Sequence, residues 1–181
     1  KAAEKNRIQD ALSKSVKQSI ARHIKQLEKE EEKIIEALTA TIEGDPVLNS
    51  RLELLDSVPG IGKATALQLI AELGNIEWFE KARDLAAYIG VTPRHWQSGT
   101  SLNSRGKISK MGSARLRAIL YFPAMAAMKH NPIMKTFATR LREDGKPEMV
   151  ILVAVMRKLV HCIFGILKNN QPFNPNIPCQ I

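Results

Sequence analysis

Acidic residues are missing from the centre of this 181-residue chain. No Asp or Glu lies between Leu85 and Arg142, although the same stretch carries ten Lys or Arg residues. A surface built from this stretch attracts anions and offers no carboxylate ligands for a metal ion. The formal net charge of +9 and a pI near 9.7 also favour a polyanionic partner, because basic side chains release counterions when they neutralise phosphates. The charge pattern therefore predicts a nucleic-acid-binding protein.

Cysteines and long apolar runs are also scarce. Cys162 and Cys179 show neither metal-ligand nor redox spacing, so we expect a reducing cytoplasm and no disulfide framework. We expect no membrane partner, because no apolar run is long enough to span a bilayer and no signal-peptide pattern is present. The first residue is Lys1 and not Met, which predicts a fragment of a longer protein.

No β-rich stretch of useful length occurs, which predicts an all-α fold with at most a small hairpin within residues 98–109. Residues 1–45 form one predicted unit, a long helix whose apolar positions recur at steps of three, four or seven from Ile8 to Ile42. Such a helix is about 50 Å long and needs a partner. Three partners stay open: a second copy, a missing N-terminal segment, or the chain's own domain. Gly44-Asp45-Pro46 ends the helix.

Residues 46–174 form the second predicted unit, a helical domain that opens on LLDSVPGIGKATALQLIAELG at residues 54–74. This segment resembles a helix-hairpin-helix motif. Gly60 and Gly62 let the backbone approach a phosphate, and Lys63 adds charge at a helix N-terminus that already favours anions. Ile61 is expected to anchor the turn in the core. The alternative is a glycine turn that serves packing alone.

The remaining elements follow from caps and breakers. We expect helices from about Phe79 to Ile89, from Ser113 to about Lys129, from Pro132 to near Asp144, and an apolar core helix from Glu148 to Lys168. The chain after Asn169, with residues 175–181 at its end, is expected to be an irregular tail.

A basic loop at residues 94–117 carries five serines and a threonine among its cations. Its predicted nucleic-acid-binding residues are Arg94, Arg105, Lys107, Lys110, Arg115 and Arg117. Residue chemistry alone favours Ser98 as a hydroxyl donor to phosphate over Ser98 as a nucleophile, because a serine needs an activating environment. His95 fits a packed or phosphate-contacting role better than that of a base.

Several short motifs in this order resemble a family of bacterial insertion-sequence transposases. They follow the helix-hairpin-helix segment and are LAAYIGVTP at 85–93, QSG at 97–99, GKISK at 106–110, LR at 116–117 and AVMRKL at 154–159. The resemblance runs from about Leu54 to Asn174, and the long helix before it resembles the coiled-coil linker of the family.

The resemblance implies a DNA recombinase in which Ser98 attacks a DNA phosphodiester and forms a phosphoserine intermediate. It also implies a structured guide RNA, dimers that assemble into a tetramer on DNA, and a bacterial cytoplasmic location. Mg²⁺ belongs to an N-terminal resolvase-like domain with Asp-Glu-Asp-Asp carboxylates, and this chain does not contain that domain. We therefore expect no metal or cofactor in the chain and no DNA cleavage by it alone. The alternative function is a non-catalytic module for DNA or RNA binding and dimerisation.

Overall fold

The computed structural model describes residues 2–10, 13–94, 97–98, 102–103, 107–109 and 111–176, and for residues 2, 9, 10, 94, 97, 98, 102, 103 and 107 it describes the backbone only. The fold is all-α. The chain divides into two compact units, Lys1–Asp45 and Pro46–Ile181, which we describe separately.

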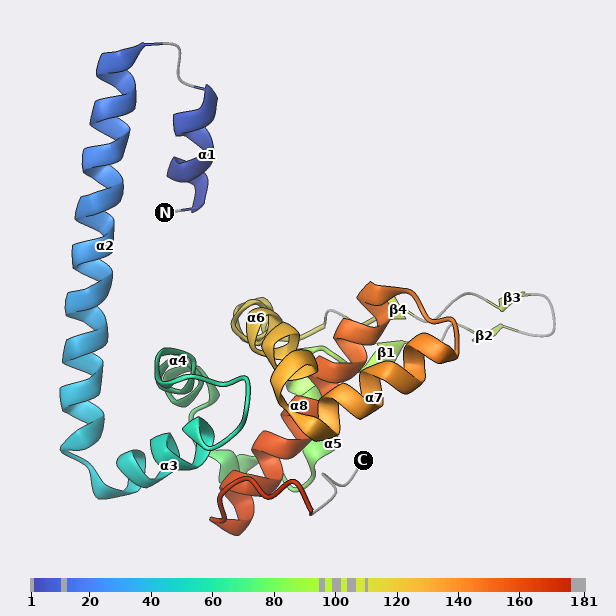
Figure 1. Ribbon diagram of the computed structural model, residues 1–181. Coiled ribbons are helices and arrows are strands. Elements are labelled where there is room, and N and C mark those ends of the chain that lie inside the picture. The colour runs from blue at the N-terminus through green and yellow to red at the C-terminus, as the bar shows by residue number, and fades with distance from the viewer. Residues whose placement is uncertain are drawn as a thin grey trace. The chain divides into compact units, whose positions relative to one another are not determined.

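The first unit is a pair of packed helices, α1 (Ala2–Asp10) and α2 (Lys14–Glu43), lying side by side in Figure 1. The prediction of one unbroken helix from Ile8 to Ile42 is therefore wrong at its N-terminal end. Ser13 has the extended backbone of a helix N-cap (φ −97°, ψ 139°), a position that serine favours, and α2 begins after it. The fold-back brings Lys5 Nζ to 3.9 Å from Glu28 Oε1. α2 ends at Glu43, next to Gly44, as the breaker residues predict.

The second unit is a set of helices around α8 (Glu148–Asn169). The others are α3 (Pro46–Asp56), α4 (Lys63–Leu73), the 3-10 helix η1 (Ile76–Trp78), α5 (Ala82–Ile89), α6 (Ala114–His130) and α7 (Pro132–Glu143). α8 packs against α3, η1, α5, α6 and α7, which explains why it is apolar on most of its circumference (Figure 1). The predicted core helix is thus confirmed.

Two predicted helix starts are confirmed by their caps. Ser113 Oγ accepts a hydrogen bond from the Leu116 amide at 3.2 Å and begins α6. Pro132 is the first residue of α7, where its missing N–H costs nothing. The buried Asn131 Oδ1 accepts from the amides of Ile133 and Met134 at 3.1 and 3.3 Å.

Two expectations about α8 need correction. Among the described residues, α8 is long and apolar enough to cross a membrane by length and composition, so the statement that no run reaches that length is wrong. Its place in the fold accounts for the composition, because 56% of the apolar window is buried inside the unit. Cys162 on this helix is disulfide-bonded, contrary to the expectation of a chain without a disulfide framework. Cys179 lies outside the described residues.

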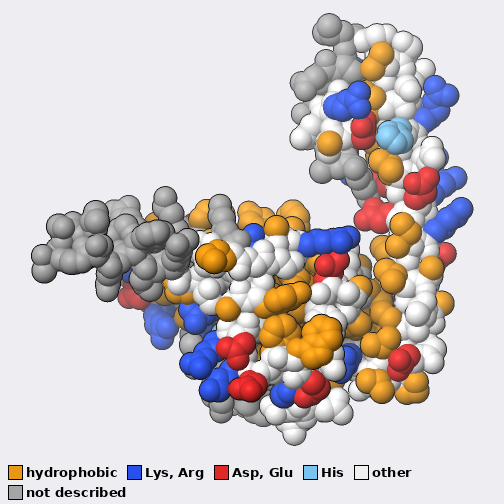
Figure 2. Space-filling model, turned by 180° about the vertical axis from the view of Figure 1, so that it is seen from behind, with side chains coloured by type: hydrophobic (Ala, Val, Ile, Leu, Met, Phe, Trp, Pro, Cys, Tyr) orange, Lys and Arg blue, Asp and Glu red, His pale blue; other side chains and the backbone are white. Residues whose placement is uncertain are grey.

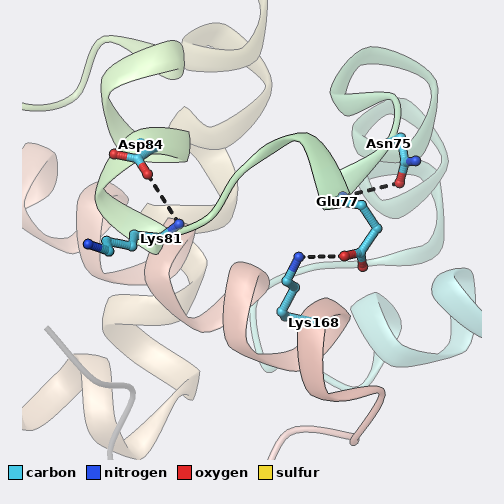
Figure 3. Close-up of polar contacts among 5 residues, drawn as sticks. All are labelled: Asn75, Glu77, Lys81, Asp84 and Lys168. Carbon is cyan, nitrogen blue, oxygen red and sulfur yellow. Dashed lines mark hydrogen bonds and ion pairs between the residues drawn. The ribbon is translucent and has the colours of Figure 1, made fainter.

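The segment between α4 and α5 also departs from prediction. Phe79 is extended (φ −105°, ψ 123°) and follows η1, so α5 begins at Ala82 and not near Phe79. Asn75 Oδ1 accepts from the Glu77 amide at 3.1 Å and caps η1, while Glu77 pairs with Lys168 of α8 (Figure 3). The Lys81 amide donates to Asp84 Oδ2 at 3.2 Å and starts α5.

A small hairpin is present, but it begins at Pro93 and not within the predicted residues 98–109. It consists of β1 (Pro93–Arg94) paired with β4 (Lys107–Ile108) and β2 (Gln97–Ser98) paired with β3 (Leu102–Asn103), both antiparallel. In Figure 1 the β1–β4 pair lies beside the helices and the β2–β3 pair lies farther out.

Candidate nucleic-acid interface

The first element of the interface is the turn between α3 and α4. Ile61 is buried, as predicted, and its amide donates to the Val58 carbonyl at 2.9 Å. Gly60 has φ +108°, and a Cβ there would lie 2.7 Å from the Ala127 amide nitrogen of α6. Gly60 therefore allows the turn to pack closely on α6, which is the packing role left open from the sequence. Its predicted phosphate contact stays a prediction.

Gly62 occupies a different environment two residues later. A Cβ at Gly62 would meet nothing within 4 Å, so this side of the turn is open. Gly62 is the N-cap of α4, provides no side-chain cap, and is followed by a first turn without an acidic residue and with Lys63 exposed. The positive end of the helix dipole at this terminus favours an anion.

The second element is the hairpin that carries Ser98. Ser98 stands on β2 with its Cα opposite that of Leu102 on β3. The backbone positions of Arg94 and Lys107 are also opposite one another, on β1 and β4, which places two predicted phosphate ligands at one level of the hairpin. The side chains of Ser98, Arg94 and Lys107 lie outside the described atoms, as do His95, Arg105 and Lys110 entirely.

The base of the hairpin is tied to α5 by close backbone contacts. The Ser109 amide donates to the Thr92 carbonyl at 2.9 Å, and the Ser113 amide to the Tyr88 carbonyl at 3.0 Å. A Cβ at Gly112 would lie 2.3 Å from the Tyr88 oxygen, a separation that only glycine permits. Gly90 ends α5 in the left-handed conformation (φ 82°), as helices commonly end.

Arg117 joins this packing from α6. Its Nη1 donates to the carbonyls of Ile89 at 2.8 Å and Gly112 at 3.1 Å. A cation at the C-terminal end of α5 is also favoured by the helix dipole. Arg117 was predicted to bind nucleic acid, and at least one of its donor groups is instead used inside the protein.

Arg115, two residues earlier on α6, faces solvent. Its side chain is 80% exposed, and Nε lies 3.1 Å from Glu72 Oε1 of α4. An ion pair this exposed is easily exchanged for a phosphate contact, because surface pairs contribute little. Arg115 therefore links α4 and α6 through a surface ion pair, and its side chain is not part of the buried core.

A cavity of about 390 Å³ lies at α7 and α8, and sequence reasoning missed it. Its lining residues are Pro132, Ile133, Thr136, Phe137, Arg140, Lys158 and Pro175. Arg140 Cζ and Lys158 Nζ lie 5.4 and 4.6 Å from the centroid of the Phe137 ring. The only sequence signal was Phe137 and Arg140 three residues apart on one helix, which does not reveal Lys158 beside them.

Apolar and charged side chains are both exposed on this unit (Figure 2). Figure 2 shows exposed apolar atoms between Lys, Arg, Asp and Glu side chains on the face seen there. Trp78 and Phe122 are among the exposed aromatic residues, at 75% and 71%. Within the described part of the chain, no three His, Cys, Asp or Glu side chains come together where they could hold a metal ion.

Comparison with known proteins finds relatives among mobile-element proteins. The chain is 37% identical to the pilin gene-inverting protein of Moraxella bovis over 133 residues, 73% of this chain and 41% of that protein. It is 39% identical over 82 residues to the transposase for insertion sequence element IS1111A of Coxiella burnetii, covering 45% of this chain and 22% of that protein. It is 28% identical over 153 residues to an uncharacterized 43.6 kDa protein of insertion element IS110 from Streptomyces coelicolor, covering 84% and 36%.

The chain therefore spans less than half the length of each of these relatives. Residues 52–139 match the family model described as "Transposase IS116/IS110/IS902 family". The match begins in α3 and ends in α7, so it includes the glycine turn, the hairpin and the Arg117 junction. Over residues 52–139 the second unit is thus similar to the domain of the IS116/IS110/IS902 transposase family.

Proposed function

We propose that this chain is the DNA-binding, serine-bearing part of an insertion-sequence transposase, with Ser98 as its nucleophile. The observation that carries the proposal is the position of Ser98 on a hairpin inside the matched segment, which contains no acidic residue from Leu85 to its end. An acid-free basic surface stabilises the charge that builds on a phosphate under attack.

The chemical step is a transesterification. Ser98 Oγ attacks the phosphorus of a DNA phosphodiester and loses its proton. The bond from phosphorus to the leaving sugar oxygen breaks, and that oxygen takes up a proton. The serine then holds one DNA end through a phosphodiester, which a hydroxyl of another strand can attack in turn. Arg94, Arg105, Lys107 and Lys110 are the residues we assign to the phosphate charge.

The family resemblance implies Mg²⁺ and a structured guide RNA in the complete transposase. The described residues bring no carboxylate cluster together, so they do not fit a Mg²⁺ site. We derive no step of the reaction through a metal, and we assign such ligands to the part of the longer relatives that this chain does not span. On this view the chain alone binds DNA without cleaving it.

The open turn before α4 is the second contact we propose. Gly62 and Lys63 fit a helix-hairpin-helix motif that holds a DNA phosphate at the N-terminus of α4, independent of base sequence. Arg115, which bridges α4 and α6 at the surface, lies at the same helix pair and adds charge there.

The α2 helix supplies the proposed dimer contact. Ile34 is 61% exposed, and Ile35 and Leu38 are only partly covered. These positions continue the apolar stripe of a coiled coil beyond the part of α2 that lies beside α1 (Figure 1). We propose that a second copy of the chain packs there.

The test uses the full-length transposase with its guide RNA, Mg²⁺ and DNA that carries the ends of the element. We expect a denaturant-resistant protein–DNA adduct with the wild type and none with Ser98→Ala. Ser104→Ala, in the same loop, is the matched control and should keep the adduct. Binding of both variants to DNA should match that of the wild type within about fivefold, because one hydroxyl donor contributes about 1 kcal/mol.

The second candidate function is a binding module without catalysis, which the lack of a carboxylate cluster among the described residues favours. The same experiment separates the two. If recombination proceeds while neither wild type nor Ser98→Ala forms an adduct, Ser98 is a phosphate-binding residue and the nucleophile lies elsewhere.

A further inference from the structure

The cavity at α7 and α8 brings two cations to one aromatic ring. Lys158 of α8 lies over the Phe137 ring, and Arg140 of α7 lies over the same ring one helical turn away. Part of this arrangement is ordinary cation–π attraction. The two positive charges nevertheless repel one another, because they share one small site.

Among the residues that the structure describes, no carboxylate lines this cavity, since none of its seven lining residues is acidic. The pKa of the Lys158 ammonium lies below its ordinary value because of its burial first and the Arg140 charge second. The nearest acidic positions on these helices, Glu143 and Glu148, do not line the cavity, and Glu148 is paired with Arg142. An anion bound between Arg140 and Lys158 would reduce the repulsion between these two charges and would stabilise the partly buried ammonium of Lys158.

Apart from Thr136, the rest of the lining is apolar. Pro132 and Ile133 come from the start of α7, and Pro175 comes from the chain after α8. A volume of about 390 Å³ falls in the range of pockets that take small organic groups. An inorganic anion would leave these apolar walls without a partner.

We propose that this cavity binds one unpaired nucleotide of a nucleic-acid strand, with its phosphate between Arg140 and Lys158 and its base against the proline, isoleucine and phenylalanine walls. Base stacking on aromatic and guanidinium planes combined with cationic phosphate contacts is the usual way in which proteins hold single strands. The inference rests on the proposed nucleic-acid function and adds a site outside both the hairpin and the turn before α4.

The test measures the binding of the 181-residue chain to fluorescein-labelled oligothymidine and oligouridine of about 12 nucleotides, a usual site size for single-strand modules. The pocket variant Arg140→Gln/Lys158→Gln should weaken binding of at least one of these strands about tenfold, the size of one stacked and ion-paired nucleotide. The matched control Lys129→Gln/Lys135→Gln removes two exposed charges from α6 and α7 that do not line the cavity, and should weaken it clearly less. Whichever strand responds more, DNA or RNA, identifies the source of the nucleotide.

A second variant separates base from phosphate. Phe137→Leu keeps an apolar side chain but removes the ring, and should weaken the ordinary strand about fivefold while leaving an abasic strand of equal length unchanged. Circular dichroism checks that each variant keeps its helices, and Arg140→Gln alone serves if another variant fails to fold, because Arg140 is exposed.

Two outcomes contradict the inference. If the pocket variant and the control variant weaken binding of the single strand and of a blunt duplex by the same factor, the two cations act only through the net charge of the protein. If the ordinary and abasic strands respond alike to Phe137→Leu, no base enters the cavity. In either case continued binding of duplex DNA leaves the proposed function intact, whereas a chain that binds neither duplex nor strand contradicts the proposed function itself.

Discussion

Residues with the same charge have different roles in this protein. Arg115 and Arg117 are two positions apart and look equivalent in the sequence. Arg115 is 80% exposed and pairs with Glu72, whereas Arg117 donates to two backbone carbonyls at the hairpin base. A helix turns by about 100° per residue, so two positions apart face nearly opposite ways. Only the neighbours of that helix decide which arginine is committed to packing.

Arg117→Gln is expected to lower the free energy of unfolding by about 1–2 kcal/mol, because the Ile89 and Gly112 carbonyls lose a charged donor. The control Arg115→Gln should change it by about 0.5 kcal/mol or less, as for other surface pairs. Urea denaturation followed by circular dichroism measures both. Equal stabilities with a selective loss of nucleic-acid binding in Arg117→Gln would show that Arg117 is a ligand and not a tether.

Gly112→Ala should lower the free energy of unfolding, although it adds only one methyl group. The added Cβ would lie 2.3 Å from the Tyr88 oxygen and 2.8 Å from the Gly90 nitrogen, so the hairpin base must shift. We expect a loss of about 2 kcal/mol of unfolding free energy, as for other overpacked sites. Gly165→Ala is the control: no atom lies within 4 Å of the new Cβ, and alanine in α8 should stabilise by about 0.5–1 kcal/mol. Thermal unfolding of the two variants should therefore shift in opposite directions.

Single elements differ in how far their sequence predicts them. The starts of α6 and α7 follow from Ser113 and Pro132, because caps act through local backbone donors and need no distant partner. The break before α2 was missed because the apolar stripe continues through residues 11–13 at helical spacing. The stripe indicates which face of the helix is apolar, whereas the extended backbone at Ser13 and the packing of α1 on α2 decide where the helix begins.

The proposed pairing of α2 leads to a prediction at this scale. Ile34→Glu should raise the dissociation constant of the dimer about tenfold or more, because a charge in an apolar seam is costly to bury. Gln18→Glu, an exposed position on the same helix, adds the same charge and should leave association unchanged. Sedimentation equilibrium gives both constants. A wild-type chain that is monomeric at high concentration would contradict this pairing.

The molecule as a whole carries a net charge of +9 with its acids concentrated before residue 85 and its central cations unopposed. If the hairpin and the turn before α4 bind one duplex, the affinity should fall steeply with salt. Replacing Arg105 or Lys107 by Gln should each reduce the slope of log affinity against log salt by about one unit.

Fluorescence anisotropy across a salt series measures this slope for each variant. Lys146→Gln, which lies between α7 and α8 outside the proposed contacts, should leave the slope nearly unchanged. An affinity that does not vary with salt would contradict the hairpin as the binding surface.

Local features of the sequence by themselves determined much of this protein. The all-α class, the apolar core helix α8, the hairpin and most helix ends follow from periodicity, caps and breakers, because these act within a few residues of the chain. The basic central segment is visible for the same reason, since charge needs no fold to be counted.

Only the tertiary structure decided which residues meet. In the fold, Phe137 and Arg140 of α7 lie beside Lys158 of α8. Gly60 packs closely on Ala127, and Arg117 donates a hydrogen bond to the Ile89 carbonyl. A pattern along one helix reports its faces but not the neighbour that each face meets, because that choice depends on how separate elements share one buried core.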